Sequence, residues 1–276
     1  MAIDNRTRDS YRPTSKGALQ RAQRLVFLRA IIWGLVGLIY APLFIGLVAL
    51  FEHLDAGLVT YVGAAALAGG AGAALYSGRE VALLGAGVGV GVGIVSLILM
   101  PHLVSFEQAG LIAGVVTVLI VLHPVFQARC IPRLPTRVVA GVITGSLCGA
   151  ALGMAEPLHP EPFSTFALLA FLVSVNGILF VASLGPLLSA TRRIHLAFLP
   201  CNWVEALVAG PLAAIAAGSV WVMAGPFLGE QGELLHTISD AVYLQLPMAL
   251  LGGIFGGALA GGLLGLFGFP WVHESR

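Results

Sequence analysis

The chain has 276 residues, of which 58% are hydrophobic and only 10% are charged, and its mean hydropathy is +0.96. A soluble domain carries about 25% charged residues, so this composition excludes a water-soluble globule and predicts a protein solvated by lipid. The formal net charge of +1 argues against a nucleic-acid partner, and the 3 cysteines provide no disulfide framework.

The N-terminal segment, residues 1–29, is rich in Arg and Lys and precedes the apolar run Ala30–Phe51. That run is too long for the hydrophobic core of a signal peptide, and no small-residue cleavage site closes it, so it predicts a retained membrane anchor. The basic segment is interpreted either as an interfacial helix on the anionic inner leaflet or as a solvated tail.

Eight segments are apolar enough to cross a bilayer, because a hydrocarbon core of about 30 Å requires about 20 apolar residues in a helix. They are Ala30–Phe51, Leu58–Tyr76, Val81–Met100, Leu111–Phe126, Val138–Met154, Phe163–Ala190, Trp203–Leu228 and Ala241–Phe267. The sequence therefore predicts an all-α, polytopic bundle of eight transmembrane helices over residues 30–270, followed by a short cytoplasmic tail, residues 271–276.

The basic residues orient these spans. With the N-terminus in the cytoplasm, all 14 Lys and Arg residues fall on one side, and the opposite loops carry carboxylates without a basic residue. This follows the positive-inside rule and predicts cytoplasmic termini and a multi-pass protein of the plasma membrane, the inner membrane of a bacterial cell. Trp33, Trp203 and Trp271 are expected at the cytoplasmic interface, and Trp221 is expected at the opposite one, as an aromatic belt.

The third span contains the stretch GAGVGVGVG, Gly85–Gly93. A period of two is typical of a strand, but a strand crosses lipid only within a closed barrel. A dinucleotide-binding loop would need its third glycine at Val90. A helix remains, and its small faces would let two neighbouring helices approach closely. These faces are Gly85, Gly89 and Gly93 on one side, with Gly87 and Gly91 nearly opposite.

The same four-residue glycine spacing recurs in spans five and eight. The predicted packing residues there are Gly141, Gly145, Gly149, Gly153, Gly253, Gly257 and Gly261. We therefore expect spans two, three, five and eight at the tightly packed centre, and spans one and six, rich in Leu, Phe and Ile, to face lipid more. Residues 51–104 resemble residues 106–160, which indicates either a duplicated hairpin or low complexity alone.

Few polar side chains lie within the spans. Asn176 with Ser174 in span six, Glu205 at the start of span seven and Gln245 in span eight are the candidates for a pathway or a coupling site. Polar groups inside a membrane are costly and are therefore functional candidates. Each also has a structural interpretation, in which Asn176 bonds to a neighbouring helix and Glu205 pairs with an arginine of residues 192–193.

Each predicted outer loop contains a histidine together with at least one carboxylate. These histidines are His53, His102, His159 and His236. Imidazole with carboxylate suits a divalent metal or a pH-sensitive surface. Because no pair has the spacing of a tight ligand set, they stay weak metal candidates and the sequence predicts no metal or other cofactor.

Enzyme motifs of the common hydrolase, metalloprotease and nucleotide-binding kinds are missing from the sequence, so no enzymatic activity is predicted. Two functions remain open. The first is a permease- or channel-like protein that moves a small solute along the contacts of spans three, five, six and eight. The alternative is a non-catalytic subunit or scaffold of a larger inner-membrane complex. The expected partners are membrane lipids and either further copies of the chain or other membrane subunits.

Overall fold

A computed structural model of the protein describes residues 15–57, 59–99, 103–123, 134–154, 162–191, 201–228 and 233–269. The described segments fold into the helices α1 (Ser15–His53), α2 (Val59–Ser77), α3 (Arg79–Leu99), α4 (Phe106–Leu122), α5 (Leu134–Met154), α6 (Pro162–Thr191), α7 (Cys201–Leu228) and α8 (Glu233–Leu266). Seven of these helices are long and apolar enough to cross a membrane, and α4 is a shorter apolar helix. The predicted all-α, multi-pass membrane architecture is confirmed.

The glycine-rich stretch Gly85–Gly93 lies entirely within α3, as the helix interpretation predicts. The start of α4 differs from the prediction, which placed it at Leu111. The helix begins at Phe106 because Ser105 and Gln108 form a capping box: the Ser105 Oγ accepts from the Gln108 backbone N–H, and the Gln108 Oε1 accepts from the Ser105 N–H. It ends at Leu122 because the residue before a proline favours an extended backbone.

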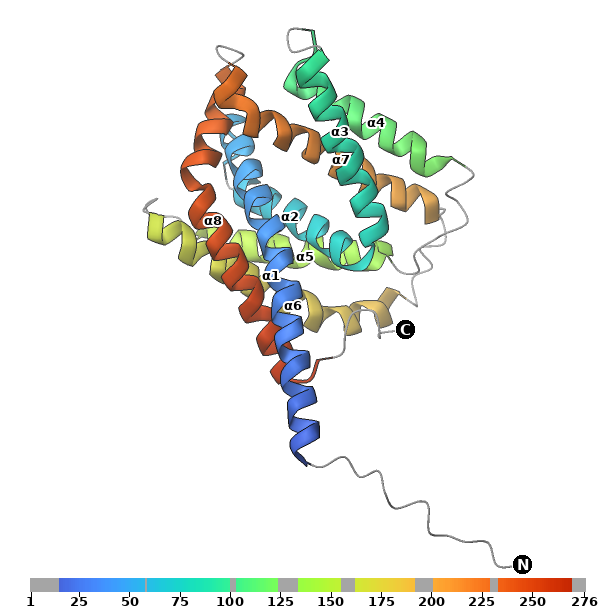
Figure 1. Ribbon diagram of the computed structural model, residues 1–276, viewed down its shortest axis with the longest axis vertical. Helices are drawn as coiled ribbons and strands as arrows, with labels where there is room; N and C mark the ends of the chain where they lie inside the picture. The colour runs from blue at the N-terminus through green and yellow to red at the C-terminus, as the bar shows by residue number, and fades with distance from the viewer. Residues whose placement is uncertain are drawn as a thin grey trace, which may run out of the picture.

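The basic segment is not separated from the first span, since α1 is one helix from Ser15 to His53. Its 39 residues make it about 58 Å long at a rise of 1.5 Å per residue, well beyond the thickness of a hydrocarbon core. In Figure 1 the first turns of α1 project from the rest of the helices. The membrane-length part of α1 begins at Gln23.

The glycine contacts fix the direction in which neighbouring helices run. On α1 and α8, numbers that rise along one helix fall along the other, so this pair is antiparallel; the facing residues are Gly37 with Gly253, Trp33 with Gly257 and Arg29 with Gly261. The pairs α2–α5 and α4–α7 are antiparallel in the same sense. In contrast, α3 and α7 run parallel, and so do α6 and α8.

These directions assign a crossing to the short helix α4. If α4 did not carry the chain across the membrane, α5 to α8 would all be reversed, and α1 would run parallel to α8. The observed antiparallel pairing of α1 with α8 and the parallel pairing of α3 with α7 therefore both require that α4 crosses the membrane. A 17-residue helix is at the lower end of the length that spans a bilayer, so α4 is just long enough for this role.

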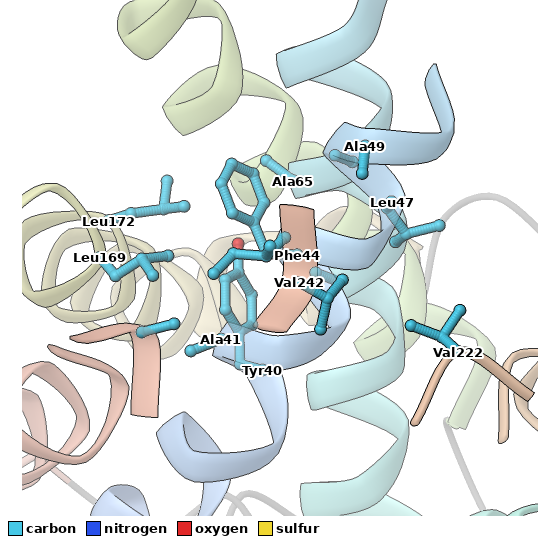
Figure 2. Packing of buried hydrophobic residues seen from close by; sticks show 14 of the residues in the cluster. Tyr40, Ala41, Phe44, Leu47, Ala49, Ala65, Leu169, Leu172, Val222 and Val242 are labelled. Atoms are coloured by element: carbon cyan, nitrogen blue, oxygen red, sulfur yellow. The ribbon is translucent and has the colours of Figure 1, made fainter. Parts of the chain in front are cut away.

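Figure 1 shows α1 and α8 running together along the long axis of the molecule, while α5 and α6 run across it. Helix α7 packs against both α3 and α4, and these three helices lie together on one side of the structure (Figure 1). The largest buried cluster is centred on the middle of α1, where Tyr40, Ala41, Phe44 and Leu47 meet side chains of α2, α6, α7 and α8 (Figure 2). The Tyr40 and Phe44 rings stack with centroids 6.3 Å apart.

Two expectations about position in the membrane are wrong. In α3, which was expected at the centre, 28% of the spanning window is buried, whereas in α6, which was expected to face lipid, the share is 56%. Helix α1 also lies in the core. The reason is that lipid tails are as apolar as Leu, so aliphatic composition does not distinguish a lipid-facing helix from a central one. Trp33 and Trp221 are buried against other helices, whereas Trp203 is 51% exposed at the start of α7.

Candidate binding site at Asn176

Asn176 lies in the middle of α6 and is only 5% exposed. Its Nδ2 donates a hydrogen bond to the hydroxyl of Tyr40 on α1, with 3.2 Å between the two atoms. Its Oδ1 is buried and has no hydrogen-bond partner among the described residues. A buried amide oxygen without a partner lowers the stability of the folded protein by about 1–3 kcal/mol, so a ligand that donates a hydrogen bond to this oxygen would be stabilised.

A small cavity of about 30 Å³ adjoins Asn176. Its described lining comes from α1, α2, α5 and α6: Trp33, Val36, Tyr40, Gly69, Gly72, Ala73, Tyr76, Gly141, Val173, Asn176, Gly177 and Phe180. A water molecule needs about 10–15 Å³ of such volume and at least two polar partners. The cavity therefore has room for water, and Asn176 with the Tyr40 hydroxyl offers the polar groups.

Glycines let the walls of this cavity approach one another. Gly69 of α2 and Gly141 of α5 face each other backbone to backbone, and a Cβ at Gly141 would lie 2.6 Å from the Cβ of Ala73. On α6, a Cβ at Gly177 would lie 2.7 Å from the Trp33 ring. Larger residues at these positions would force the helices apart, so the geometry around Asn176 depends on bare backbone.

The cavity continues toward the end of the molecule where α1 and α5 begin and α2 and α8 end. Tyr76 marks this end, with its ring 5.1 Å from the Trp33 ring. Arg29 is buried and donates from its guanidinium to the Leu264 carbonyl at 3.3 Å and to the Phe269 carbonyl at 2.6 Å. This end is the predicted cytoplasmic side. A cation such as Arg29 stabilises the C-terminus of a helix, here that of α8, because it binds the last carbonyl groups.

Ser174 does not share the site with Asn176. Its Oγ donates to the Ala170 carbonyl on its own helix at 2.6 Å and to the Gly256 carbonyl of α8 at 3.0 Å. Residues two apart on a helix point in nearly opposite directions, so Asn176 faces α1 while Ser174 faces α8. Ser174 thus joins two helices and does not line the cavity.

Glu205 and Gln245 also lie apart from Asn176. Glu205 is buried near the start of α7, among the residues that pack on α3 and α4, and it engages a neighbouring group. Its expected partners, residues 192–193, lie outside the described residues. Gln245 is half-buried on α8 and is not among the described residues that line the cavity beside Asn176. The structure therefore does not bring the four candidate polar residues into one site.

The predicted packing glycines lie at helix contacts. Gly85, Gly89 and Gly93 face α7, where a Cβ at Gly85 would be 2.5 Å from the Ala209 carbonyl oxygen. In α5, the residues that contact α2 are Gly141, Gly145 and Gly149, and Gly153 is buried. In α8, the residues that contact α1 are Gly253, Gly257 and Gly261. The opposite face of α3 differs from the prediction of a second close neighbour, since a Cβ at Gly87 or Gly91 would meet nothing within 4 Å.

The histidine candidates do not assemble into a metal site in the part of the chain that the structure describes. His53 is exposed at the end of α1 and His236 is half-buried in the first turns of α8. His102 and His159 lie outside the described residues. Where side chains are described, no group of three or more His, Cys, Asp and Glu residues gathers as metal ligands would.

Sequence reasoning missed the aromatic residues of the site. Tyr40 lies deep within the first span rather than at its end, and such a depth is unusual for an interfacial tyrosine, whose hydroxyl normally reaches the headgroups. Trp33 and Tyr76 fall near the ends of their predicted spans, Ala30–Phe51 and Leu58–Tyr76, and carry no comparable signal. The sequence matches no protein-family model, no curated protein and no solved structure.

Proposed function

We propose that the protein is a permease-like membrane protein that moves a small polar solute past Asn176. The observation that carries the proposal is the unpartnered Oδ1 of this buried residue beside a cavity in the middle of the helices. An acceptor of this kind favours a solute that donates a hydrogen bond. The described lining holds no charged side chain, which favours a neutral solute.

The cavity volume of about 30 Å³ admits water but nothing much larger. Passage of a larger solute therefore requires a second conformation, in which α1 moves away from α2 and α6. The α1–α2 contact includes Gly72, where a Cβ would lie 3.7 Å from the Tyr40 ring, so this contact can open without moving a side chain of α2. The pathway proposed here uses α1, α2, α5 and α6 in place of the contacts of spans three, five, six and eight.

The test is solute flux into vesicles that contain the purified protein, with urea and glycerol as the probes. Asn176→Leu removes both polar atoms, and we expect it to lower the protein-dependent flux about tenfold, since tenfold corresponds to about 1.4 kcal/mol. Ser146→Ala is the control, because Ser146 is half-buried on α5, away from the cavity, and its hydroxyl bonds to the Val142 carbonyl of its own helix. Unchanged flux with Asn176→Leu would rule out this pathway.

Glu205 and Gln245 enter the proposal as coupling residues separate from the pathway. Glu205→Gln keeps the size of the side chain and removes its charge. If Glu205 couples transport to an ion gradient, this variant will retain passive exchange of solute and lose uphill accumulation. Equal accumulation by the variant and the wild type would show that Glu205 has no coupling role.

A second candidate function is a scaffold or non-catalytic subunit of a larger membrane complex. The specific observation in its favour is the open face of α3, where Gly87 and Gly91 have no neighbour within 4 Å. Native mass measurement of gently solubilised membranes separates the candidates. Co-purifying foreign subunits that are lost in Gly91→Leu would support the scaffold, whereas a monomer or a small homo-oligomer would argue against it.

A further inference from the structure

A larger cavity of about 470 Å³ lies between α1, α4, α7 and α8, away from Asn176. Its described lining includes Pro42 and Leu47 of α1, Val222 of α7 and Val242 of α8. In Figure 2, Leu47, Val222 and Val242 lie around one space beside α1. Pockets that bind ligands are about 300–1,000 Å³ in volume and mostly apolar, so this cavity has the size of a binding site.

The lining residues place this cavity in the predicted outer half of the membrane. Leu50 lies near the end of α1, Phe106 and Glu107 begin α4, Met223 is near the end of α7 and Ile238 is near the start of α8. All of these helix ends are opposite the end that carries Arg29 and Arg137. The cavity therefore lies at the depth of the hydrocarbon tails of the outer leaflet, just below their headgroups.

Two prolines explain why the helices separate here. Gly37 and Gly253 pack α1 against α8 backbone to backbone, and at Gly46, farther along α1, a Cβ would meet only the Val242 Cγ2, 4.0 Å away. Between these levels, α1 contains Pro42 and α8 contains Pro247. The antiparallel register sets these two prolines side by side. Because a proline inside a helix bends it, the pair opens the outer half of the α1–α8 contact.

The chemistry of the lining excludes water as the natural occupant. Among the described lining residues, Glu107 is the only charged side chain and Ser219 the only hydroxyl, and the Ser219 hydroxyl already donates to the Ile215 carbonyl at 2.9 Å. Apolar cavities of this kind stay dry and take apolar ligands. Leu111 and Met223 on the rim are 69% and 56% exposed, so the cavity opens sideways toward lipid.

We propose that this cavity binds one hydrocarbon chain of an outer-leaflet lipid whose headgroup carries an ammonium group, as in phosphatidylethanolamine. The chain enters between Leu111 and Met223 and reaches Leu47, Val222 and Val242. The ammonium group pairs with the exposed carboxylate of Glu107 at the level of the headgroups. This site is separate from the proposed solute pathway and stands independently of it.

The test is photo-crosslinking of the purified protein in nanodiscs with lipids that carry a diazirine in one acyl chain. Lipid that merely surrounds the protein labels exposed residues such as Leu244 and Phe255. A chain inside the cavity also labels Leu47, Val222 and Val242, which are buried from the surface. Mass spectrometry of the labelled peptides distinguishes the two patterns, and labelling confined to the exposed residues would overturn the proposal.

Gly46→Leu narrows the cavity, because Gly46 lines it and a Cβ there would meet only the Val242 Cγ2, 4.0 Å away. We expect this variant to lower labelling of the three buried residues about tenfold, since a Leu side chain takes part of the space through which the lipid chain would reach them. Gly91→Leu is the matched control, as it adds the same side chain at an open position on α3. Equal labelling of the buried residues in both variants would contradict the site.

The headgroup is tested with phosphatidylethanolamine and phosphatidylglycerol probes that carry the same labelled chain. We expect the ammonium lipid to label the buried residues more strongly, and Glu107→Gln to remove that preference while leaving chain labelling in place. Equal labelling by the two lipids in the wild type would overturn the pairing of Glu107 with an ammonium group.

Discussion

Asn176 of α6 and Tyr40 of α1 are joined by a hydrogen bond of 3.2 Å between the amide nitrogen and the phenol oxygen. Both residues are buried in the middle of their helices, where little else is polar. The bond uses the donor of the amide and leaves its acceptor, the Oδ1, buried without a partner among the described residues, on a side chain that lines the adjoining cavity. The Nδ2 of Asn176 therefore joins α6 to α1, while the Oδ1 of the same side chain would accept a hydrogen bond from a solute.

The Asn176–Tyr40 contact predicts energetic coupling between the two side chains. Tyr40→Phe removes the acceptor of the Nδ2 donor, and we expect it to lower the free energy of unfolding by about 1–3 kcal/mol, because the amide donor is left buried without a partner. In an Asn176→Leu background the same change should cost much less. Unfolding in mixed detergent micelles measures the cycle, and additive effects of the two changes would show that the bond contributes nothing.

The two faces of α3 predict opposite responses to the same substitution. Gly89→Leu places a side chain against α7, where even a Cβ would lie 2.8 Å from the Ala216 Cβ, and we expect a loss of about 1–3 kcal/mol or more in unfolding free energy. Gly91→Leu adds the same atoms where nothing lies within 4 Å and should be neutral or slightly stabilising. Thermal unfolding in detergent compares them, and equal losses would contradict the assignment of faces.

The buried guanidinium of Arg29 predicts a stabilising role at the end of α8. Arg29→Gln removes the charged donor to the Leu264 and Phe269 carbonyls, and hydrogen bonds of charged groups contribute about 1.5–3 kcal/mol. Arg24→Gln makes the same charge change at an exposed position on the same helix. We expect a lower unfolding temperature for Arg29→Gln only. A similar decrease in both variants would assign the effect to lost net charge.

Much of the fold follows from the sequence. Backbone N–H and C=O groups without hydrogen bonds are costly in lipid, and a helix pairs them within one segment as it crosses the membrane. Gly85–Gly93 is helical for this reason, despite its strand-like period. Four-residue glycine spacing predicts small faces, and these faces do lie at helix contacts, as with Gly253 on Gly37. The partner helix was not predictable, since a small face fits many backbones equally well.

The site was predictable only in part. Asn176 is noticeable because an amide in the middle of a span is costly unless it is bonded. Its partner is harder to predict, because the depth of Tyr40 in its span is unusual but does not show which helix the hydroxyl faces. Ser174 was grouped with Asn176 by proximity in sequence, but two residues along a helix separate side chains by about 200°. The α6–α8 hydrogen bond of Ser174 follows from that geometry.

Helix α4 crosses the membrane and so sets the direction of every later helix. Cysteine labelling tests it most directly, with Cys130, Cys148 and Cys201 replaced and a single cysteine introduced at Ser105 or at His123, the residues that flank α4. In sealed vesicles of one orientation, a membrane-impermeant maleimide should reach only one of these positions, and vesicles of the opposite orientation should expose the other. Labelling of both positions from the same side would show that α4 does not cross, and would contradict the account.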